Sequence, residues 1–343
     1  MKLSVPDRAT PVVTASIYCA GALDRLICEA IAPFWTRMAE RAAARDCFLW
    51  FARYGRGGEH LKVRFHGPPE SRQEVRQALS RAVRDFLASL PGEAAPADRD
   101  CKASQFPVDP EDECSSAYPD RTLLWTTHRW VPGIMGRHPM SDDSRHAALF
   151  TRCLGIASEI NLRSFRPAPD GTIPPALRTS LALKFFVATY RALRLPAEAR
   201  VEYLRYHRDW LLTSFELDVA RLCEQFDERL RRRPEVLEGL RPLLDGEREG
   251  DSEGEGAVDG DLFASWQERA AELFDYVLER ANDPGFLRDP YLKDQVFATP
   301  FKLVHALTNQ LATGVMNEGY LCQLLLRACE DGWPDATQER RLG

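Results

Sequence analysis

Four basic side chains alternate along one short segment of the chain. Residues 60–67 read HLKVRFHG, so His60, Lys62, Arg64 and His66 alternate with apolar residues. Because successive side chains of a strand point to opposite faces, a strand here places the four on one face, about 7 Å apart. Aligned like charges repel each other unless an anion or acidic neighbours offset them. The spacing therefore indicates either a site that holds a carboxylate or another oxyanion, or a solvated outer face.

A histidine in the C-terminal part of the chain is the second candidate. In the segment LVHALTNQL, a helix makes His305, Thr308 and Asn309 neighbours at positions i, i+3 and i+4. The same helix carries an apolar stripe, which consists of Val304, Leu307 and Leu311. A neutral imidazole can both donate and accept a proton near pH 7, which makes His305 a candidate acid or base. The alternative is a histidine that is satisfied in the core or at the surface.

Two further segments carry a histidine next to an arginine. The segment TTHRW places His128 and Arg129 at successive strand positions, hence on opposite faces, so only one of them can join a common site. The segment RYHRDW contains His207 and Arg208, which fan around the axis if the segment is helical. We interpret this second pair as part of a polar stripe beside Trp210.

Strands in the first 130 residues must position the basic face. Residues 47–55 are apolar on both faces, as in a central strand. The sequence GRGGE then supplies a turn into residues 60–67, which predicts a hairpin. Residues 12–20 and 121–131 are predicted to form two more strands.

Helices are predicted around these strands and through most of the remaining chain. Residues 22–44 have helical apolar spacing, although Pro33 should bend or restart the helix. Residues 68–90 form a second helix, which begins with proline. Residues 92–120 are typical of a long irregular excursion, and beyond residue 140 the chain is almost wholly helical.

These elements predict an α+β fold, with an early antiparallel sheet packed against a mostly helical C-terminal half. One domain is expected over residues 1–343, because the strands alone could not cover both of their faces. Residues 247–261 contain seven acids and four glycines. Such a composition buries too little apolar surface to offset the loss of conformational entropy on ordering. We therefore predict a flexible loop rather than an acidic binding tail.

Composition excludes several classes of protein. The 343 residues are 44% hydrophobic and 28% charged, which is typical of a globular protein. Lys+Arg 45 against Asp+Glu 51 gives a net charge of −6, so no global field attracts nucleic acid. Nine scattered cysteines form no CxxC pair, which indicates a reducing cytoplasm and no zinc site. No phosphate-binding, dinucleotide-binding or metal motif occurs, so we expect no cofactor, no metal and no membrane span.

Three segments together resemble a known family. FLWFARYGRGGEHLKVRF is similar to the hairpin of the glutamate-elimination domain of class I lanthipeptide dehydratases, and KLVHALTNQL to its C-terminal histidine helix. TTHRW with SDDSRHAALFTRCLGIASEI resembles its middle strand and the following helix more loosely. The same fold serves stand-alone enzymes of thiopeptide biosynthesis, which include pyridine synthases. The resemblance spans nearly the whole chain, which corresponds to one glutamate-elimination domain. The large glutamyl-transfer domain of the dehydratases has no counterpart in this resemblance.

The resemblance implies roles for individual residues. Lys62 and Arg64 take the places of the family's arginine pair, His305 that of its catalytic histidine, and Arg129 that of its middle-strand arginine. We expect these four to be catalytic. The substrate-binding candidates are Tyr54, His60, Asn309 and Gln310.

Two departures from the family pattern bear on the reaction. Lys62 replaces an arginine and so loses the bidentate fork for a carboxylate, and Gln310 replaces another arginine. Glutamate elimination must hold the leaving carboxylate, so both losses favour the pyridine synthases, which have relaxed this set of residues.

Three functions remain open at the level of sequence. The first is a lyase-type tailoring enzyme that forms a six-membered nitrogen ring from two dehydroalanines and releases the leader peptide. The second is elimination of glutamate from glutamylated Ser or Thr, and the third is a non-catalytic partner that binds the precursor peptide. The implied partners are a modified precursor peptide with its leader and a separate glutamyl-transfer dehydratase.

Overall fold

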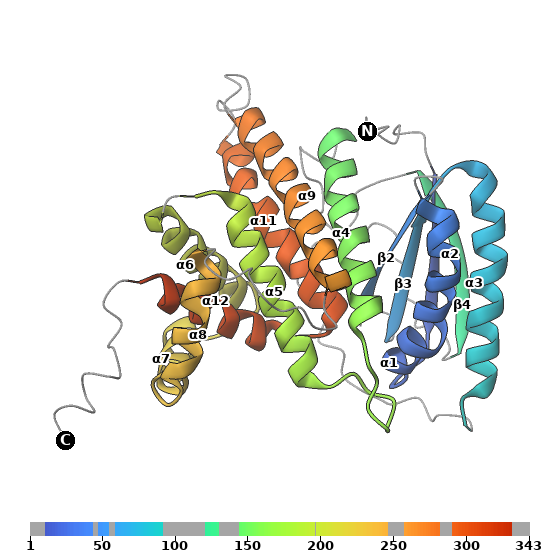
Figure 1. Ribbon diagram of the computed structural model, residues 1–343, viewed down its shortest axis with the longest axis horizontal. Helices are drawn as coiled ribbons and strands as arrows, with labels where there is room; N and C mark the ends of the chain where they lie inside the picture. The colour runs from blue at the N-terminus through green and yellow to red at the C-terminus, as the bar shows by residue number, and fades with distance from the viewer. Residues whose placement is uncertain are drawn as a thin grey trace.

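Four strands form one antiparallel sheet in the spatial order β2-β3-β1-β4 (Figure 1). They are β1 (Pro11–Tyr18), β2 (Phe48–Tyr54), β3 (His60–His66) and β4 (Thr122–Arg129). The computed structural model describes residues 11–43, 47–54, 59–91, 121–129, 144–195, 197–245, 257–281 and 290–330. The four predicted strands are confirmed. The hairpin is also confirmed, since Tyr54 pairs with His60 and Phe48 with His66; the predicted turn and the excursion at 92–120 lie mainly outside the described residues.

Helices cover the apolar face of the sheet, which carries Leu61, Val63 and Phe65. They are α1 (Leu23–Leu26), the π-helix η1 (Ile27–Ile31), α2 (Ala32–Ala43) and α3 (Pro69–Ser89). On this face Trp125 of β4 donates its Nε1–H to Ser80 Oγ of α3 at 3.1 Å. The predicted interruption at Pro33 is confirmed: proline has no N–H to give to the preceding turn, and the helix widens into the π-helix just before it.

The rest of the described chain is helical, as predicted (Figure 1). The helices are α4 (Ser144–Ser164), α5 (Pro175–Leu193), α6 (Ala197–Ser214), α7 (Val219–Arg231), α8 (Pro234–Asp245), α9 (Ala257–Ala281), α11 (Pro290–Leu311) and α12 (Val315–Cys329). The α+β fold class is therefore confirmed. Within the described ranges, every helix falls short of the length and apolarity that crossing a membrane requires.

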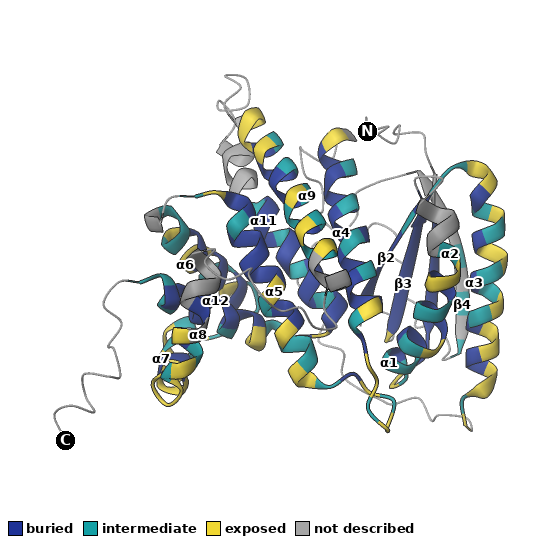
Figure 2. Cartoon of the chain, in the orientation of Figure 1, coloured by how far each residue is buried: buried dark blue, intermediate teal, exposed yellow. Residues whose placement is uncertain are grey.

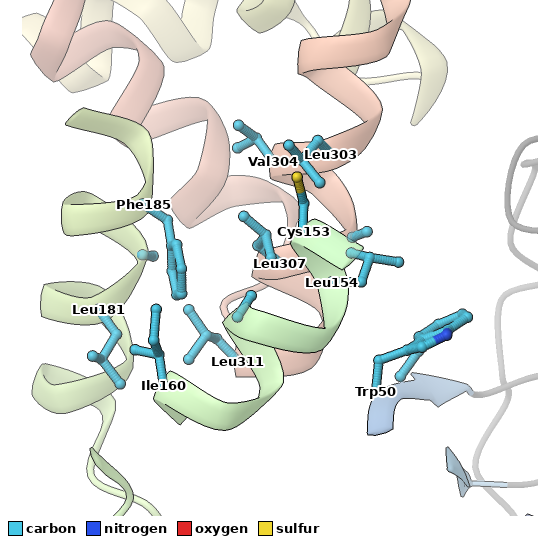
Figure 3. Close-up of a cluster of buried hydrophobic side chains, with 14 of the residues drawn as sticks. Trp50, Cys153, Leu154, Ile160, Leu181, Phe185, Leu303, Val304, Leu307 and Leu311 are labelled. Atoms are coloured by element: carbon cyan, nitrogen blue, oxygen red, sulfur yellow. The ribbon is translucent and has the colours of Figure 1, made fainter. Parts of the chain in front are cut away.

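Helix α4 lies between the edge strand β2 and the other helices (Figures 1 and 3). Its residue Gly155 meets Phe48 of β2, and an added Cβ would lie 2.8 Å from the phenyl ring. Its residue Ser158 accepts the backbone N–H of Phe51 at 3.3 Å, which satisfies a donor on the sheet edge. One continuous hydrophobic core thus runs from the sheet through α4 to the helices beyond it.

The acidic segment differs in part from its prediction. Helix α9 begins at Ala257, so residues 257–261 are helical rather than part of a loop. Residues 246–256 lie outside the described residues. A helix can start within this composition because α9 buries an apolar face that includes Trp266 and Phe274.

A carboxylate on α1 joins the sheet to the helical half. Asp24 accepts hydrogen bonds from Arg53 of β2 at 2.7 Å, from Arg178 of α5, and from the N–H of Ile173 at 2.9 Å. Burial alone would raise the pKa of Asp24. The Ile173 hydrogen bond and the two arginine charges outweigh that effect, so the pKa lies below its usual range.

The same two arginines cap the C-terminus of α11. Arg53 donates its Nε–H to the carbonyl of Gln310 at 3.1 Å, and Arg178 donates to the carbonyl of Leu311 at 2.7 Å. The last carbonyls of a helix have no intrahelical donors, and its C-terminus attracts cations. We call Asp24, Arg53 and Arg178 the interface clamp, because their contacts fix the end of α11 against β2.

We predict that Asp24→Ala lowers the free energy of unfolding by about 3 kcal/mol, because it leaves two largely buried guanidinium groups without their carboxylate. Urea unfolding at neutral pH measures the change. In the wild-type protein this contribution is lost as the pH falls below 3.8, the usual carboxyl value, toward the lower folded pKa. The control is Asp275→Asn, which breaks an exposed pair with Arg194; equal losses in both variants would contradict the assignment.

Candidate active site

The basic face of β3 is buried. The relative exposure is 4% for Lys62 and 7% for Arg64, and His60 and His66 are buried as well (Figure 2). The alternative of a solvated outer face is therefore wrong. All four side chains lie on the side of β3 opposite Leu61, as the alternation predicted.

Aromatic rings of β2 accompany the two cations. The Lys62 Nζ lies 4.5 Å from the centre of the Tyr54 ring, and the Arg64 guanidinium lies 4.6 Å from that of Trp50. Arg64 also donates to the Tyr54 hydroxyl at 3.2 Å. Contacts of this kind offset part of the cost of burying a cation. Tyr54, whose face the sequence left uncertain, therefore joins Lys62 and Arg64 in one group.

The two histidines of β3 are not equivalent to these cations. His66 accepts the Trp50 Nε1–H at 3.3 Å, and burial together with the charges of Arg64 and Arg72 lowers its pKa to about 3. It is therefore uncharged at neutral pH, contrary to its prediction as one of four cations. His60 is stacked between the rings of Tyr18 and Tyr54, at 4.5 and 5.3 Å.

A buried hydroxyl lies next to Arg64. Thr14 of β1 pairs across the strands with Arg64, and Ser16 pairs with Lys62, so their side chains share the basic face. Thr14 is buried, and its Oγ1 has no hydrogen-bond partner among the described residues. A buried hydroxyl without a partner is costly unless another group occupies the position beside it. We refer to Tyr54, Lys62, Arg64 and Thr14 as the cationic group.

Helix α11 presents one partly exposed stripe. Ala298, Lys302, His305 and Asn309 are partly exposed, whereas every other described residue from 299 to 311 is buried. Their spacing of four, three and four residues places them on one side of the helix. The apolar stripe predicted on the rest of this helix is confirmed (Figure 3), since Val304, Leu307 and Leu311 are buried.

A buried glutamate holds His305. The Oε2 atom of Glu318 in α12 lies 3.0 Å from His305 Nδ1 and accepts the Thr308 hydroxyl at 2.6 Å. Its Oε1 atom lies 3.2 Å from Nε2 of His207 in α6. The relative exposure of the side chains is 1% for Glu318 and 23% for His305. A carboxylate on Nδ1 directs the Nε2 edge of the ring outward, as in other histidines that transfer protons.

Charge is divided unequally between the two imidazoles. Burial lowers the pKa of both, but the Glu318 carboxylate and its hydrogen bond raise the pKa of His305 above its usual value. The pKa of His207 stays below its usual value, because burial outweighs the same carboxylate. Burial would raise the pKa of Glu318, yet the two histidines lower it to about 2. His305 is thus the imidazole of the two that keeps its proton to higher pH, and it is paired with a glutamate that is ionised at neutral pH.

Lys302 lies one turn before His305 on the partly exposed stripe. Burial of its amine lowers the pKa to about 8, so a neutral fraction exists near physiological pH. Residues three apart on a helix are about 5–6 Å apart at Cβ. The stripe therefore combines an imidazole of raised pKa with an amine of lowered pKa.

The interface clamp joins the C-terminal end of α11 to strand β2. Arg53 of β2 donates to the Gln310 carbonyl. Arg53 lies on the face opposite the basic residues, where it pairs with Asp24.

The amide of Gln310 points into the interior, where its Oε1 accepts from Asn161 of α4 at 2.9 Å. The structure therefore places Gln310 in the packing between α4 and α11, whereas the sequence suggested a substrate contact. Arg129 ends β4, and its side chain lies outside the described residues.

Sequence reasoning missed Glu318, Lys302 and the part that His207 has in this site. Glu318 stands alone in NEGYLC, and no spacing signals that its carboxylate reaches His305. His207 and Arg208 were interpreted as an open polar stripe, but both are buried, and Arg208 donates to Gln323 of α12. Only Lys302 left a signal, because it precedes His305 by three residues.

Among the described residues, no group of three or more His, Cys, Asp or Glu side chains is arranged to hold a metal ion. Free thiols include those of Cys28, Cys153, Cys223 and Cys322.

The fold can be compared with those of known proteins. Residues 13–110 match the family model described as the lantibiotic biosynthesis dehydratase C-terminal domain. The predicted resemblance to the lanthipeptide dehydratase C-terminal family is confirmed by this match and by the fold.

Two solved structures are similar to the chain over almost its whole length. A pyridine synthase from thiomuracin biosynthesis, TbtD, is 18% identical with a TM-score of 0.64, and the match covers 94% of this chain and 98% of that one. TsrL is also 18% identical with a TM-score of 0.54, and the match covers 96% and 97%. At this identity the likeness shows a shared fold. No curated protein matches the sequence.

We predict that the Lys302 amine is modified by acetic anhydride with a half-maximal rate near pH 8, because burial lowers its pKa to about that value. Mass spectrometry of proteolytic fragments after brief treatment at a series of pH values gives this midpoint. Lys184 is exposed and serves as the internal comparison. A Lys302 midpoint near 10.5, the usual lysine value, would contradict the prediction.

Proposed function

We propose that this protein is a tailoring enzyme for ribosomally made peptides of the thiopeptide type. In the proposed reaction, two dehydroalanines of one precursor peptide join in a formal [4+2] cycloaddition that forms a six-membered nitrogen ring. The observation that supports this best is the His305–Glu318 pair on a partly exposed stripe, at the end of α11 that the interface clamp ties to β2. The end-to-end similarity in fold to a pyridine synthase supports the choice of reaction.

The first task of such an enzyme is to hold two dehydroalanines together. A well-oriented intramolecular encounter lowers the barrier by several kcal/mol, about 7–11 at most. The cationic group suits this role, because Lys62 and Arg64 can donate to peptide carbonyls while Tyr54 holds them in place. The unpartnered Thr14 hydroxyl offers one more donor beside Arg64.

The second task is proton transfer. The amide between the dehydroalanines must become its iminol, which requires loss of the N–H proton and protonation of the oxygen. Aromatisation then expels water and releases the leader peptide as an amide, and each leaving group needs a proton. The imidazolium of His305 is suited to donate these protons, and the neutral fraction of Lys302 is suited to accept them. Asn309 on the same stripe would bind a carbonyl.

Glutamate elimination is the second candidate. It needs a firm grip on a leaving carboxylate, which the cationic group could provide through Arg64 and Lys62. An ammonium at position 62 lacks the bidentate geometry that an arginine gives. At position 310 an uncharged amide replaces the second arginine of the family pattern, and this amide contacts Asn161 instead of a ligand. We therefore favour cyclisation. A non-catalytic partner that binds the precursor peptide is the third candidate.

We predict that the protein converts a peptide with two dehydroalanines behind a leader into a cyclised product and free leader peptide. Mass spectrometry of the products decides between the candidates. A glutamylated peptide that loses its glutamate, without ring formation from the first substrate, would favour elimination instead. Binding of both peptides without conversion would favour the non-catalytic role.

We predict that His305→Ala lowers kcat by about 10²- to 10⁴-fold, the usual contribution of a positioned acid or base. Peptide binding, measured by fluorescence anisotropy, should change little, because the cationic group is intact. Arg194→Gln on the exposed surface is the control for handling and folding. Unchanged turnover in folded His305→Ala would exclude the proposed proton transfer.

A further inference from the structure

We propose that Glu318 is the positioning residue of this site: it fixes His305 by Nδ1 and turns its Nε2 edge toward the substrate. The inference rests on the proposed function for its catalytic meaning. The electrostatic coupling of Glu318 to His305 can be tested separately, whichever reaction the protein performs.

The geometry around Glu318 is that of a built carboxylate site. Three side chains meet its two oxygen atoms: His305 and Thr308 from α11 at Oε2, and His207 from α6 at Oε1. Glu318 itself lies in the first turn of α12, where the free N–H groups favour a negative charge. A buried carboxylate is stable only when it is paired and hydrogen-bonded, and here three partners meet that condition.

The two histidines differ in their access to the outside. The ring of His207 is enclosed by Phe186, Tyr203 and Phe301, whose ring centres lie 4.6–6.0 Å away. His305 stacks on Phe301 at 6.0 Å and remains partly exposed on the stripe. His207 therefore acts from inside as a neutral donor that orients the carboxylate, whereas His305 is the imidazole that can reach a substrate.

Among the described residues, Lys302 lies one turn before His305 on α11, and the further titratable groups near Glu318 are Tyr203 of α6 and Cys322 of α12. Burial raises the pKa of both well above the usual values, and the Glu318 charge adds to the effect. Both are uncharged at neutral pH. The charge of Glu318 is thus balanced by His305, and removal of the carboxylate should act first on that imidazole.

The decisive experiment is Glu318→Gln in the full chain, with the His305 pKa measured by NMR on protein labelled at histidine Cε1. The chain has seven histidines, and His305→Gln assigns the resonance. In the wild-type protein the His305 pKa should lie above 6.5. In Glu318→Gln it should fall below 6.5, because burial then acts without the compensating charge.

Activity gives the second readout. If His305 donates protons as an acid, the enzyme loses activity as the pH rises through the pKa of His305. Glu318→Gln should therefore move this loss to lower pH and reduce kcat at neutral pH by at least about tenfold, with KM nearly unchanged. Glu318→Asp, which keeps the charge, should restore part of the raised pKa. A merely structural glutamate would not move the pH profile.

Glu330→Gln is the matched control, since Glu330 follows α12 and pairs with Arg327 away from His305. If Glu318→Gln does not fold, Thr308→Val removes one hydrogen bond from the same carboxylate, and its His305 pKa should shift measurably from the wild-type value. An unchanged His305 pKa in whichever variant is folded overturns the proposal. Absence of turnover in the wild-type protein, with the pKa shift present, refutes the proposed function and leaves the Glu318–His305 coupling established.

Discussion

The interface clamp is the interaction on which the rest of the structure depends. Asp24 binds Arg53 of β2 and Arg178 of α5, and the two arginines in turn bind the last carbonyls of α11. The guanidinium groups gain a carboxylate partner, and the last carbonyls of the helix gain hydrogen-bond donors. Because the stripe with His305 and Asn309 lies on α11, its position relative to the sheet depends on this clamp.

Buried charges are stabilised by different means on the sheet and in the helical half. On the sheet, Lys62 and Arg64 lie against the rings of Tyr54 and Trp50, which offset part of the cost of burying the two cations. In the helical half, Glu318 is surrounded by two imidazoles and a hydroxyl that fully occupy it. The first arrangement suits binding, whereas the second suits orientation of one proton-transfer group.

The fold is compatible with more than one reaction, so the choice between them depends on particular side chains. An ammonium at Lys62, an inward amide at Gln310 and a partly neutral amine at Lys302 favour proton transfer to and from a peptide over capture of a free carboxylate. The uncharged His66 points the same way, because it reduces the positive charge of the basic face.

Local patterns were enough to predict the strands, the hairpin, the interruption at Pro33 and the single face that carries Lys62 and Arg64, because side-chain periodicity acts within one element. They also identified His305 and the apolar stripe beside it. The tertiary structure alone decided that this face is buried, that Arg53 turns away to Asp24, and that Glu318 and His207 meet His305. These contacts join residues from separate helices and strands, and the charge of each group depends on the burial and partners that packing creates.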